Sequence, residues 1–469
     1  MKRLFCCFII AFLISIFSFA CDSSKKSPTS DDTTPLTKEE WLQENAVSFT
    51  SLDASNEDFS DLETLKTIIG DAKIVMLGEQ SHGDGTTFEA KVRLVKFLHQ
   101  EMGFDVISFE SGLYDCYKAW QLMQQGTPAL EAAQEAIFSL WTECREVEPL
   151  FTYMNTTLGS GQELELAGFD SQFTGDISAE FFVQDLNEFL EDAGIDTTGR
   201  EFWQESKAIL QKLTERGYNY DDIPDASTQN SFFAALSQIK NELDKPSTRA
   251  DSRETAFWIQ LLTSIAVHAE MTWNIIWDNF CLTPKEVFNL RDDQMGYNLV
   301  WLSNSYYPNR KIIAWAASRH VARNITSIKV EGDPDFYDGY STMGRVVWES
   351  VGALSYTLCF TAYDGSAGSI YDPPWSIGAA SVGSMEYFMS SAGLENAIID
   401  FRNISAGGEW LKEDLSCRAF GYAPATADWT DVMDGIMFTR VMEPATPIGA
   451  GKLNAYNTLF EYSVEQRFH

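Results

Sequence analysis

The stretch from Lys73 to Glu110 constrains the fold more than any other part of this sequence. It begins with a short apolar run, Lys73–Gly78, that stops at a glycine, which is typical of a buried parallel strand. A second run of this kind, Asp105–Glu110, follows after a segment whose apolar residues have helical spacing. A strand, a helix and a strand in this order predict a βαβ unit and therefore an α/β fold.

Acidic side chains and an imidazole stand at the ends of these two runs. Glu79 and His82 follow the first run in a turn bounded by glycines, and Glu110 ends the second. We interpret the two strands as neighbours, so the three side chains are expected at one edge of the sheet, where open α/β folds bind ligands. The N-terminus of the following helix disfavours an imidazolium, so His82 is predicted to be a neutral general base.

Glu89, in the same segment, is interpreted as a helix-capping residue. Thr86–Glu89 resembles a capping box, in which the glutamate accepts a hydrogen bond from the backbone at the start of a helix.

The remainder of the chain repeats the strand signal and interrupts it once. Further strand patterns precede and follow a stretch, 177–304, that is almost wholly helical. We predict an α/β fold with a mostly parallel sheet, flanking helices and a large inserted helical subdomain. The core would comprise residues 39–176 and 305–469, and the insert at 177–304 would wall or cover a pocket.

The first residues have the pattern of an export signal. Lys2 and Arg3 precede an apolar run, and Ala20-Cys21 resembles a bacterial lipoprotein cleavage site. We expect residues 1–21 to be a lipoprotein signal peptide and residues 22–38 a polar tether. A lipid at Cys21 would anchor the protein in the bacterial cell envelope, on the periplasmic side or at the cell surface. The alternative is an ordinary secretory signal with a coincidental cysteine.

Composition excludes one class of partner. The chain has 34 basic and 68 acidic residues, a formal net charge of −34, which would repel nucleic-acid phosphates. None of the eight cysteines occurs in a CxxC spacing, so no cysteine-based metal site is expected.

Motifs spread along the chain resemble those of the erythromycin esterase family. They occur in order at Gly78–Gly83, Glu89, Lys91, Gly103–Phe104, Glu110, Trp141, Glu146–Val147, Gly168–Asp170, Arg291–Asp292, Met295, Asn298, Trp315, His320–Val321, Asp434–Ile436 and Pro444–Pro447. The resemblance implies hydrolysis of an ester or lactone in a small-molecule substrate, without a metal or other cofactor.

The resemblance also implies roles for individual residues. His82 would be the general base, Glu79 and Glu110 would orient it, and His320 would complete the catalytic set. The guanidinium of Arg291 would stabilise an oxyanion. The residues expected at the substrate are Arg291, Asp170, Lys91, Glu89, Trp315, Arg319 and Met295.

One departure from the family pattern leaves alternatives open. Macrolide-hydrolysing members carry Trp-Ala-His-Asn-x-His, whereas this chain has Trp315-Ala-Ala317-Ser-Arg-His320. The protein could then use Ser318 or Arg319 as another donor, or it could be a ligand-binding lipoprotein without turnover. A metal-dependent hydrolase with ligands among Glu79, His82, Glu110 and His320 is a third interpretation.

Overall fold

The structure is a computed structural model that describes residues 36–200, 202–215, 220–245, 248, 250–275 and 284–449. The expected signal peptide (1–21), the lipid site at Cys21 and residues 22–35 of the expected tether lie outside the described residues. The described residues from Thr37 onward form one compact unit. None of the helices in this described part combines the length and the apolar character needed to span a membrane.

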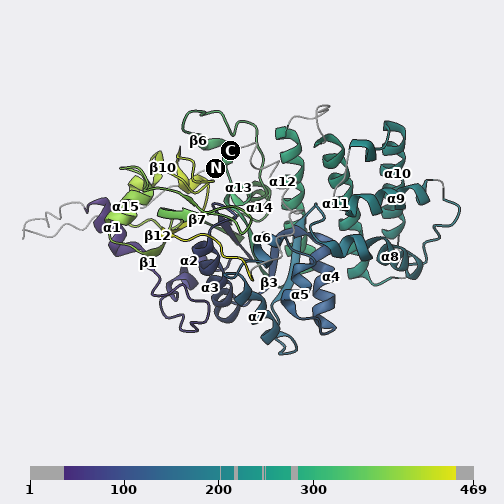
Figure 1. Ribbon diagram of the computed structural model, residues 1–469, viewed down its shortest axis with the longest axis horizontal. Helices are drawn as coiled ribbons and strands as arrows, with labels where there is room; N and C mark the ends of the chain where they lie inside the picture. The colour runs from purple at the N-terminus through teal and green to yellow at the C-terminus, as the bar shows by residue number, and fades with distance from the viewer. Residues whose placement is uncertain are drawn as a thin grey trace, which may run out of the picture. The chain divides into compact units, whose positions relative to one another are not determined.

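A large sheet forms the centre of the fold (Figure 1). Its strands, in spatial order, are β1 (Val47–Ser48), β9 (Asn396–Asp400), β12 (Gly435–Met442), β7 (Ser355–Ala367), β2 (Ile74–Glu79), β5 (Lys311–Ala317), β3 (Phe104–Gly112) and β4 (Glu165–Asp170), and β8 (Trp375–Ser376) pairs with β7. The run from β12 to β4 is parallel throughout, while β9, β1 and β8 pair antiparallel. The predicted mostly parallel α/β sheet is therefore confirmed.

The order of the strands corrects one expectation. β2 and β3 are not neighbours, because β5 lies between them and pairs in parallel with both. The sequence could not show this, since β5 comes about two hundred residues later in the chain. As a result, three strand ends rather than two meet where Glu79 and Glu110 lie.

Helices cover both faces of the sheet. They are α1 (Lys38–Asn45), α2 (Thr64–Ile69), α3 (Gly85–Met102), α4 (Leu113–Gln124), α5 (Ala129–Gln134), α6 (Ser139–Thr142), α7 (Glu148–Thr157), α8 (Asp176–Asp192), α9 (Trp203–Thr214), α10 (Ala226–Leu243), α11 (Ser252–Ile275), α12 (Pro284–Trp301), α13 (Ser318–Val321), α14 (Met343–Val351) and α15 (Met385–Ser391). Alternate residues of β2 show the two faces: Val75 and Leu77 join a core with α2–α7, and Ile74 and Met76 join one with α8–α15.

The helices within 177–304 do not all lie apart from the sheet. Figure 1 shows α8, α9, α10 and α11 together at one end of the molecule. The next helix, α12, instead packs against β4 and α14. It is followed by a π-helical turn, η2 (Leu302–Tyr306), that leads into β5. The division into an α/β core and a helical lid stays a prediction.

The remaining short elements lie around the sheet. A second, antiparallel sheet contains β10 (Leu415–Cys417), β11 (Ala425–Ala427) and β6 (Lys329–Val330). The 3₁₀ turns are η1 (Tyr220–Asp222), η3 (Ile325–Ser327), η4 (Gly352–Leu354), η5 (Glu409–Lys412) and η6 (Trp429–Asp431).

The capping box at Thr86–Glu89 is wrong. The N-cap of α3 is Asp84, which makes no side-chain cap hydrogen bond. The Thr86 hydroxyl instead accepts a hydrogen bond from the backbone N–H of Glu443 at 2.9 Å. Glu89 is exposed on α3, so its motif position is not explained by helix capping.

Close packing at the end of β2 gives the first test. A Cβ added to Gly78 would lie 2.5 Å from Val321 Cγ2 and 2.9 Å from Ser318 Cα, both in α13. Gly78→Ala should therefore lower the free energy of unfolding by about 1–3 kcal/mol, since α13 must move. Chemical denaturation measures this, and an unchanged unfolding midpoint would contradict the tight contact between β2 and α13.

Candidate active site

The carboxyl ends of four parallel strands bring the predicted residues together. In register, Glu79 at the end of β2 is opposite Ala317 of β5, and Asp170 at the end of β4 is opposite Gly112 of β3. Glu110 lies two residues before the end of β3. Parallel strands present these ends at one edge of the sheet, which explains why residues so distant in sequence meet.

Glu79 is the buried centre of the first cluster. Its side chain is 0% exposed, and its Oε1 lies 3.1 Å from His82 Nδ1 and accepts a hydrogen bond from Trp141 Nε1 at 3.2 Å. Its Oε2 forms an ion pair with Lys91 Nζ, which is also buried. Both oxygens of the carboxylate are therefore bonded, as a buried charge requires.

His82 lies at the margin of this cluster. Its side chain is 19% exposed, and its ring meets the Trp141 indole edge to face, with the ring centroids 5.5 Å apart. One ring nitrogen therefore faces a buried carboxylate while part of the imidazole reaches the surface. This is the arrangement expected of a base that is oriented from inside the protein and meets a substrate from outside.

Lys91 contacts Glu79 from the interior of the protein. Besides the ion pair, its Nζ donates to the carbonyl of Ala316 at 3.1 Å and lies 4.6 Å from the Trp315 ring centroid. Burial lowers the pKa of Lys91 below its usual value, although the charge of Glu79 opposes this. Lys91, Trp315 and Met295 are each 0% exposed, so the structure places these three expected substrate residues in the interior.

A second cluster surrounds Glu110. Its Oε1 lies 3.1 Å from His320 Nε2 and accepts from Arg291 Nη2 at 2.9 Å, and its Oε2 accepts from the backbone N–H of Ala317 at 3.1 Å. The other nitrogen of His320, Nδ1, lies 2.9 Å from Asp292 Oδ1. His320 is thus held between two buried carboxylates.

The charges around His320 and Glu110 shift the pKa values of both groups. Burial alone would lower the pKa of His320, but Asp292 and then Glu110 raise it to about 10. Burial would raise the pKa of Glu110, but His320 and Arg291, with a contribution from His82, hold it well below its usual range. His320 is an imidazolium at neutral pH, so it cannot accept a proton there and instead supplies positive charge.

Arg291 joins β3 and β4 from α12. Its Nη2 donates to Asp170 at 2.6 Å as well as to Glu110, and its Nε donates to Asp170 at 3.1 Å. Among the described residues, none accepts a hydrogen bond from Nη1, and the side chain is 15% exposed. The guanidinium thus retains one nitrogen as a donor.

The residues that follow β5 are already engaged in other contacts. The Ser318 hydroxyl donates to the carbonyl of Gly78 at 2.7 Å and is buried. The guanidinium of Arg319 lies 4.0 Å from the ring centroid of Phe288, and that ring stacks on His320. Ala317, which replaces the first histidine of the family pattern, is partly exposed beside Glu110.

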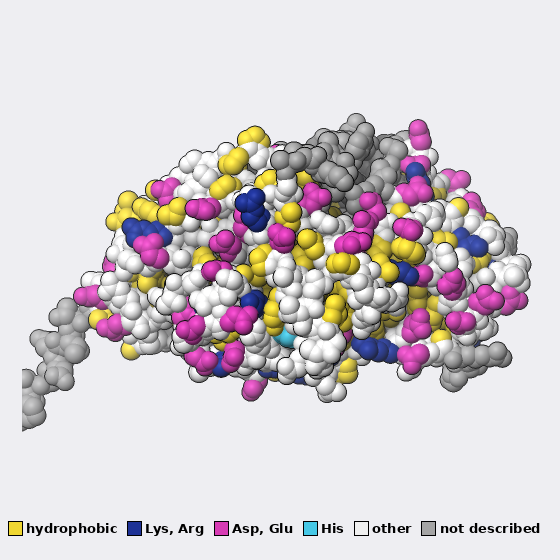
Figure 2. Space-filling view, turned by 60° about the horizontal axis from the view of Figure 1, so that its bottom comes forward, with side chains coloured by type: hydrophobic (Ala, Val, Ile, Leu, Met, Phe, Trp, Pro, Cys, Tyr) yellow, Lys and Arg dark blue, Asp and Glu magenta, His cyan; other side chains and the backbone are white. Residues whose placement is uncertain are grey.

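Glu89 is the predicted residue that the structure places elsewhere. It lines a groove of about 810 Å³ with Asp53, Glu57, Glu146 and Glu148, beside Lys96 and Arg145. Although Glu89 is exposed, partial desolvation within the groove raises its pKa, and the charges of Glu146, Glu443 and Asp53 add to this. Figure 2 shows that acidic side chains are spread over the whole face drawn there, so this groove is not unusual in its charge.

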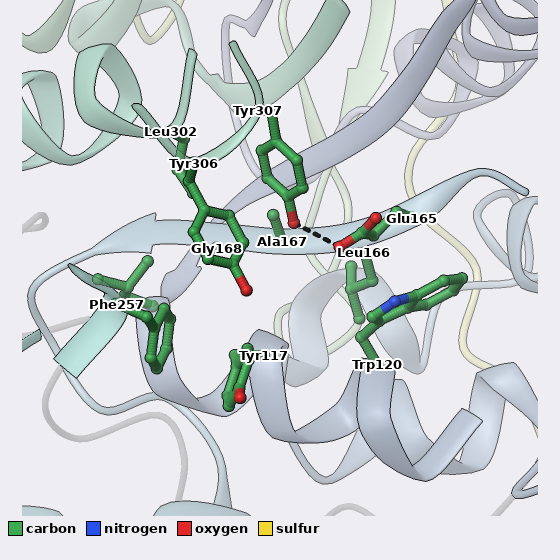
Figure 3. Close-up of a pocket in the computed structure, with 11 residues that line it drawn as sticks. Tyr117, Trp120, Glu165, Leu166, Ala167, Gly168, Phe257, Leu302, Tyr306 and Tyr307 are labelled. Atoms are coloured by element: carbon green, nitrogen blue, oxygen red, sulfur yellow. Dashed lines mark hydrogen bonds between the residues drawn. The ribbon is translucent and has the colours of Figure 1, made fainter. Parts of the chain in front are cut away.

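A small cavity lies along β4, from Glu165 to Gly168 (Figure 3). It has a volume of about 10 Å³, enough for a single water molecule, and Tyr117, Phe257 and Tyr306 line it. At its margin, the Tyr307 hydroxyl donates to Glu165 at 2.6 Å. None of the residues that line this cavity belongs to either cluster of the candidate site.

Sequence reasoning gave no role to Asp292 and Trp141, although both stand in the quoted motifs. Each acts through a partner from another element: Asp292 binds His320, and Trp141 donates to Glu79. The roles of Asp292 and Trp141 become visible only when the structure shows which elements lie side by side. Within the described ranges, no group of three or more His, Cys, Asp or Glu side chains has the arrangement of a metal site.

The charge of His320 predicts a pH dependence of stability. Its pKa is 6.5 ordinarily and about 10 in the folded protein. Because the folded pKa is the higher one, this stabilisation is complete below pH 6.5 and is lost as the pH rises through about 10.

The free energy of unfolding should therefore decrease across this range, as measured by chemical denaturation. In Asp292→Asn, which removes the largest opposing charge, the decrease should be smaller. An equal decrease in both proteins would contradict the assignment to His320.

The sequence and the fold are similar to those of known proteins. The sequence matches the erythromycin esterase family over residues 99–440. It is 26% identical over 482 residues to "Putative hydrolase YbfO" of Bacillus subtilis (strain 168), covering 96% of this chain and 100% of that protein. It is 21% identical over 402 residues to "Erythromycin esterase type II" of Escherichia coli, covering 78% of this chain and 89% of that protein.

Solved structures share the fold. A succinoglycan biosynthesis protein matches with a TM-score of 0.70 at 18% identity, over 90% of this chain and 100% of that one. A mutant of the erythromycin esterase EreC in its open conformation matches with a TM-score of 0.62 at 15% identity, over 85% of this chain and 98% of that one. The family match spans most of the sequence, and this chain belongs to the erythromycin esterase family of hydrolases.

Proposed function

We propose that this protein hydrolyses a carboxylic ester or lactone, with His82 as general base for the attacking water. The observation that supports this most directly is the 3.1 Å contact between His82 Nδ1 and the buried carboxylate of Glu79. A neutral ring that donates its Nδ1–H to Glu79 carries its lone pair on Nε2, which can then accept a proton from water. Membership of the erythromycin esterase family supports the same reaction class.

The reaction balances with His82 as the only proton carrier. Nε2 takes a proton from water as the water oxygen attacks the ester carbonyl carbon, and a tetrahedral oxyanion forms. When the carbon–oxygen bond to the alcohol breaks, the imidazolium returns the proton to the leaving alkoxide. The products are a carboxylic acid and an alcohol. Glu79 stabilises the imidazolium between these two steps.

The second cluster supplies positive charge for the oxyanion. Arg291 is fixed by Asp170 and Glu110, and its Nη1 is available as a donor. His320, charged at neutral pH, lies on the same carboxylate of Glu110. A preorganised cation of this kind stabilises developing negative charge without reorganising during the reaction. We assign to Arg291 the role of hydrogen-bond donor to the oxyanion. We assign to His320 the role of holding Glu110 and the residues around it in place.

A binding protein without turnover is the second candidate function. Ala317 stands where macrolide-hydrolysing members carry a histidine, and the Ser318 hydroxyl is already bonded to Gly78. If the reaction needs a second proton donor near β5, this chain would bind its ligand and leave it intact. Purified protein assayed against a panel of lactones and aryl esters separates the two. Saturable binding without hydrolysis of any compound would favour the binding protein.

The role of His82 gives the main test of the proposal. His82→Gln should lower kcat by about 100- to 10,000-fold, because the ring that accepts the proton is lost. The matched control is His99→Gln. His99 lies on α3 outside the site, and its Nδ1 is 2.6 Å from the hydroxyl of Tyr153 on α7. That variant should keep kcat within about twofold.

Activity in His82→Gln near that of the wild type, with the same thermal unfolding curve, would refute the base. Activity measured with a chelator and elemental analysis of the active protein test the metal-dependent alternative. Insensitivity to the chelator would contradict that alternative.

We further propose that Cys21 carries the lipid that anchors the protein in the cell envelope. The signal-like residues 1–21 and the small residue before Cys21 support this. Wild-type protein expressed in bacteria should partition with membranes, and Cys21→Ala should move it to the soluble fraction. Mass spectrometry of the mature N-terminus identifies the lipid directly. The same distribution in both proteins would contradict the anchor.

A further inference from the structure

One tyrosine hydroxyl closes the turn that carries His82. Gln80 and Asp84 stand two residues before and two residues after His82 in the chain. The Tyr422 hydroxyl accepts a hydrogen bond from Gln80 Nε2 at 2.9 Å and donates one to Asp84 Oδ1 at 2.9 Å. A single side chain from a distant loop therefore bridges the two residues that flank the imidazole.

Backbone contacts hold the same turn from two further segments. The carbonyl of Gln80 accepts from the N–H of Gly421, next to Tyr422, at 2.9 Å. The carbonyl of Gly83 accepts from Gly368 at 3.1 Å and from Ala445 at 3.0 Å. Because a turn has few hydrogen bonds of its own, these contacts from elsewhere in the fold decide where His82 points.

Tyr422 adopts an unfavourable backbone conformation in this position. Its φ is 63°, in the left-handed region that bulky residues rarely occupy. The side chain is buried, with the Trp375 ring edge-on at 5.6 Å and the Arg418 guanidinium 5.6 Å from its ring centroid. Strain of this kind persists where surrounding contacts impose it, and it is commonly found at functional sites.

Asp84 provides the acceptor from a fully buried position. It is 0% exposed, and its Oδ2 has no hydrogen-bond partner within the described part of the chain. Burial raises the pKa of Asp84 well above its usual value, and the nearby charge of Glu79 adds to this despite the hydrogen bond from Tyr422. The raised pKa favours the protonated form of Asp84 over the ionised form beside Glu79.

We propose that Tyr422 and Asp84 are positioning residues for His82, and that the Tyr422 hydroxyl fixes the imidazole against Glu79 by bridging both sides of its turn. Neither side chain is assigned contact with substrate. The kinetic consequences of this inference rest on the proposed esterase function, whereas the geometry of the turn does not.

Tyr422→Phe tests the bridge, because it removes only the hydroxyl. We expect kcat to fall at least about tenfold with KM nearly unchanged, since a displaced base affects the chemical step more than binding. The matched control is Tyr307→Phe, which removes another buried hydroxyl, bonded to Glu165, far from the site. It should leave kcat within about twofold. An equal loss of kcat in both variants, or none in Tyr422→Phe, would overturn the proposal.

Two substitutions of Asp84 separate positioning from charge. Asp84→Ala removes the acceptor of the Tyr422 hydroxyl and should lower kcat as Tyr422→Phe does. Asp84→Asn keeps a side chain of the same length with an acceptor oxygen but cannot ionise. It should recover most of the kcat that is lost in Asp84→Ala. If Asp84→Asn is as damaging as Asp84→Ala, the ionised carboxylate is required and the positioning role is refuted.

A spectroscopic measurement tests the bridge even if no ester is hydrolysed. The chain has five histidines, so each ring can be followed by NMR in protein with labelled histidine, and His82→Gln assigns the His82 signals. Tyr422→Phe should shift the His82 ring signals and its titration while leaving those of His99 unchanged. Unchanged His82 signals would overturn the inference. Shifted signals without esterase activity in the wild type would refute the proposed function alone.

Discussion

The buried ion pair between Lys91 and Glu79 is the interaction on which the rest of the site depends. Neither side chain is exposed, and separating two such charges inside a protein is costly unless each is fully bonded. Here Lys91 also binds the carbonyl of Ala316, and Glu79 also binds Trp141 and His82. The pair thus connects α3, β5 and α6 to the end of β2. His82 contacts this network through Glu79, while Tyr422 bridges the two residues that flank its turn.

The charges of the second cluster alternate in sign along a single path. Asp292, His320, Glu110, Arg291 and Asp170 follow one another, and each contacts the next. Each charge is therefore offset by its neighbours, which permits so many ionised groups to remain buried together. The path runs from α12 through α13 to β3, and then through Arg291 of α12 to β4. These contacts hold α12 against the sheet edge that carries the site.

The replacement of a family histidine by Ala317 affects the surroundings of the site more than its centre. The backbone N–H of Ala317 still donates to Glu110, so the second cluster is intact without an imidazole there. What changes is the space beside Glu110, which a methyl group fills less completely than a ring. The contacts of His82, Glu79 and Arg291 do not involve the missing side chain. The departure therefore leaves the contact between His82, the proposed base, and Glu79 in place.

The sequence alone determined the fold class and the residues at the centre of the site. Apolar runs that end in glycine or glutamate identified the parallel strands, because strand burial and turn chemistry are local properties. The sequence did not reveal that β5 lies between β2 and β3, since the pairing of strands depends on contacts between residues far apart in the chain. It also did not reveal the charge of His320, the burial of Lys91 and Trp315, or the bridge from Tyr422. Each of these depends on which groups surround a side chain in space, and only tertiary packing decides that.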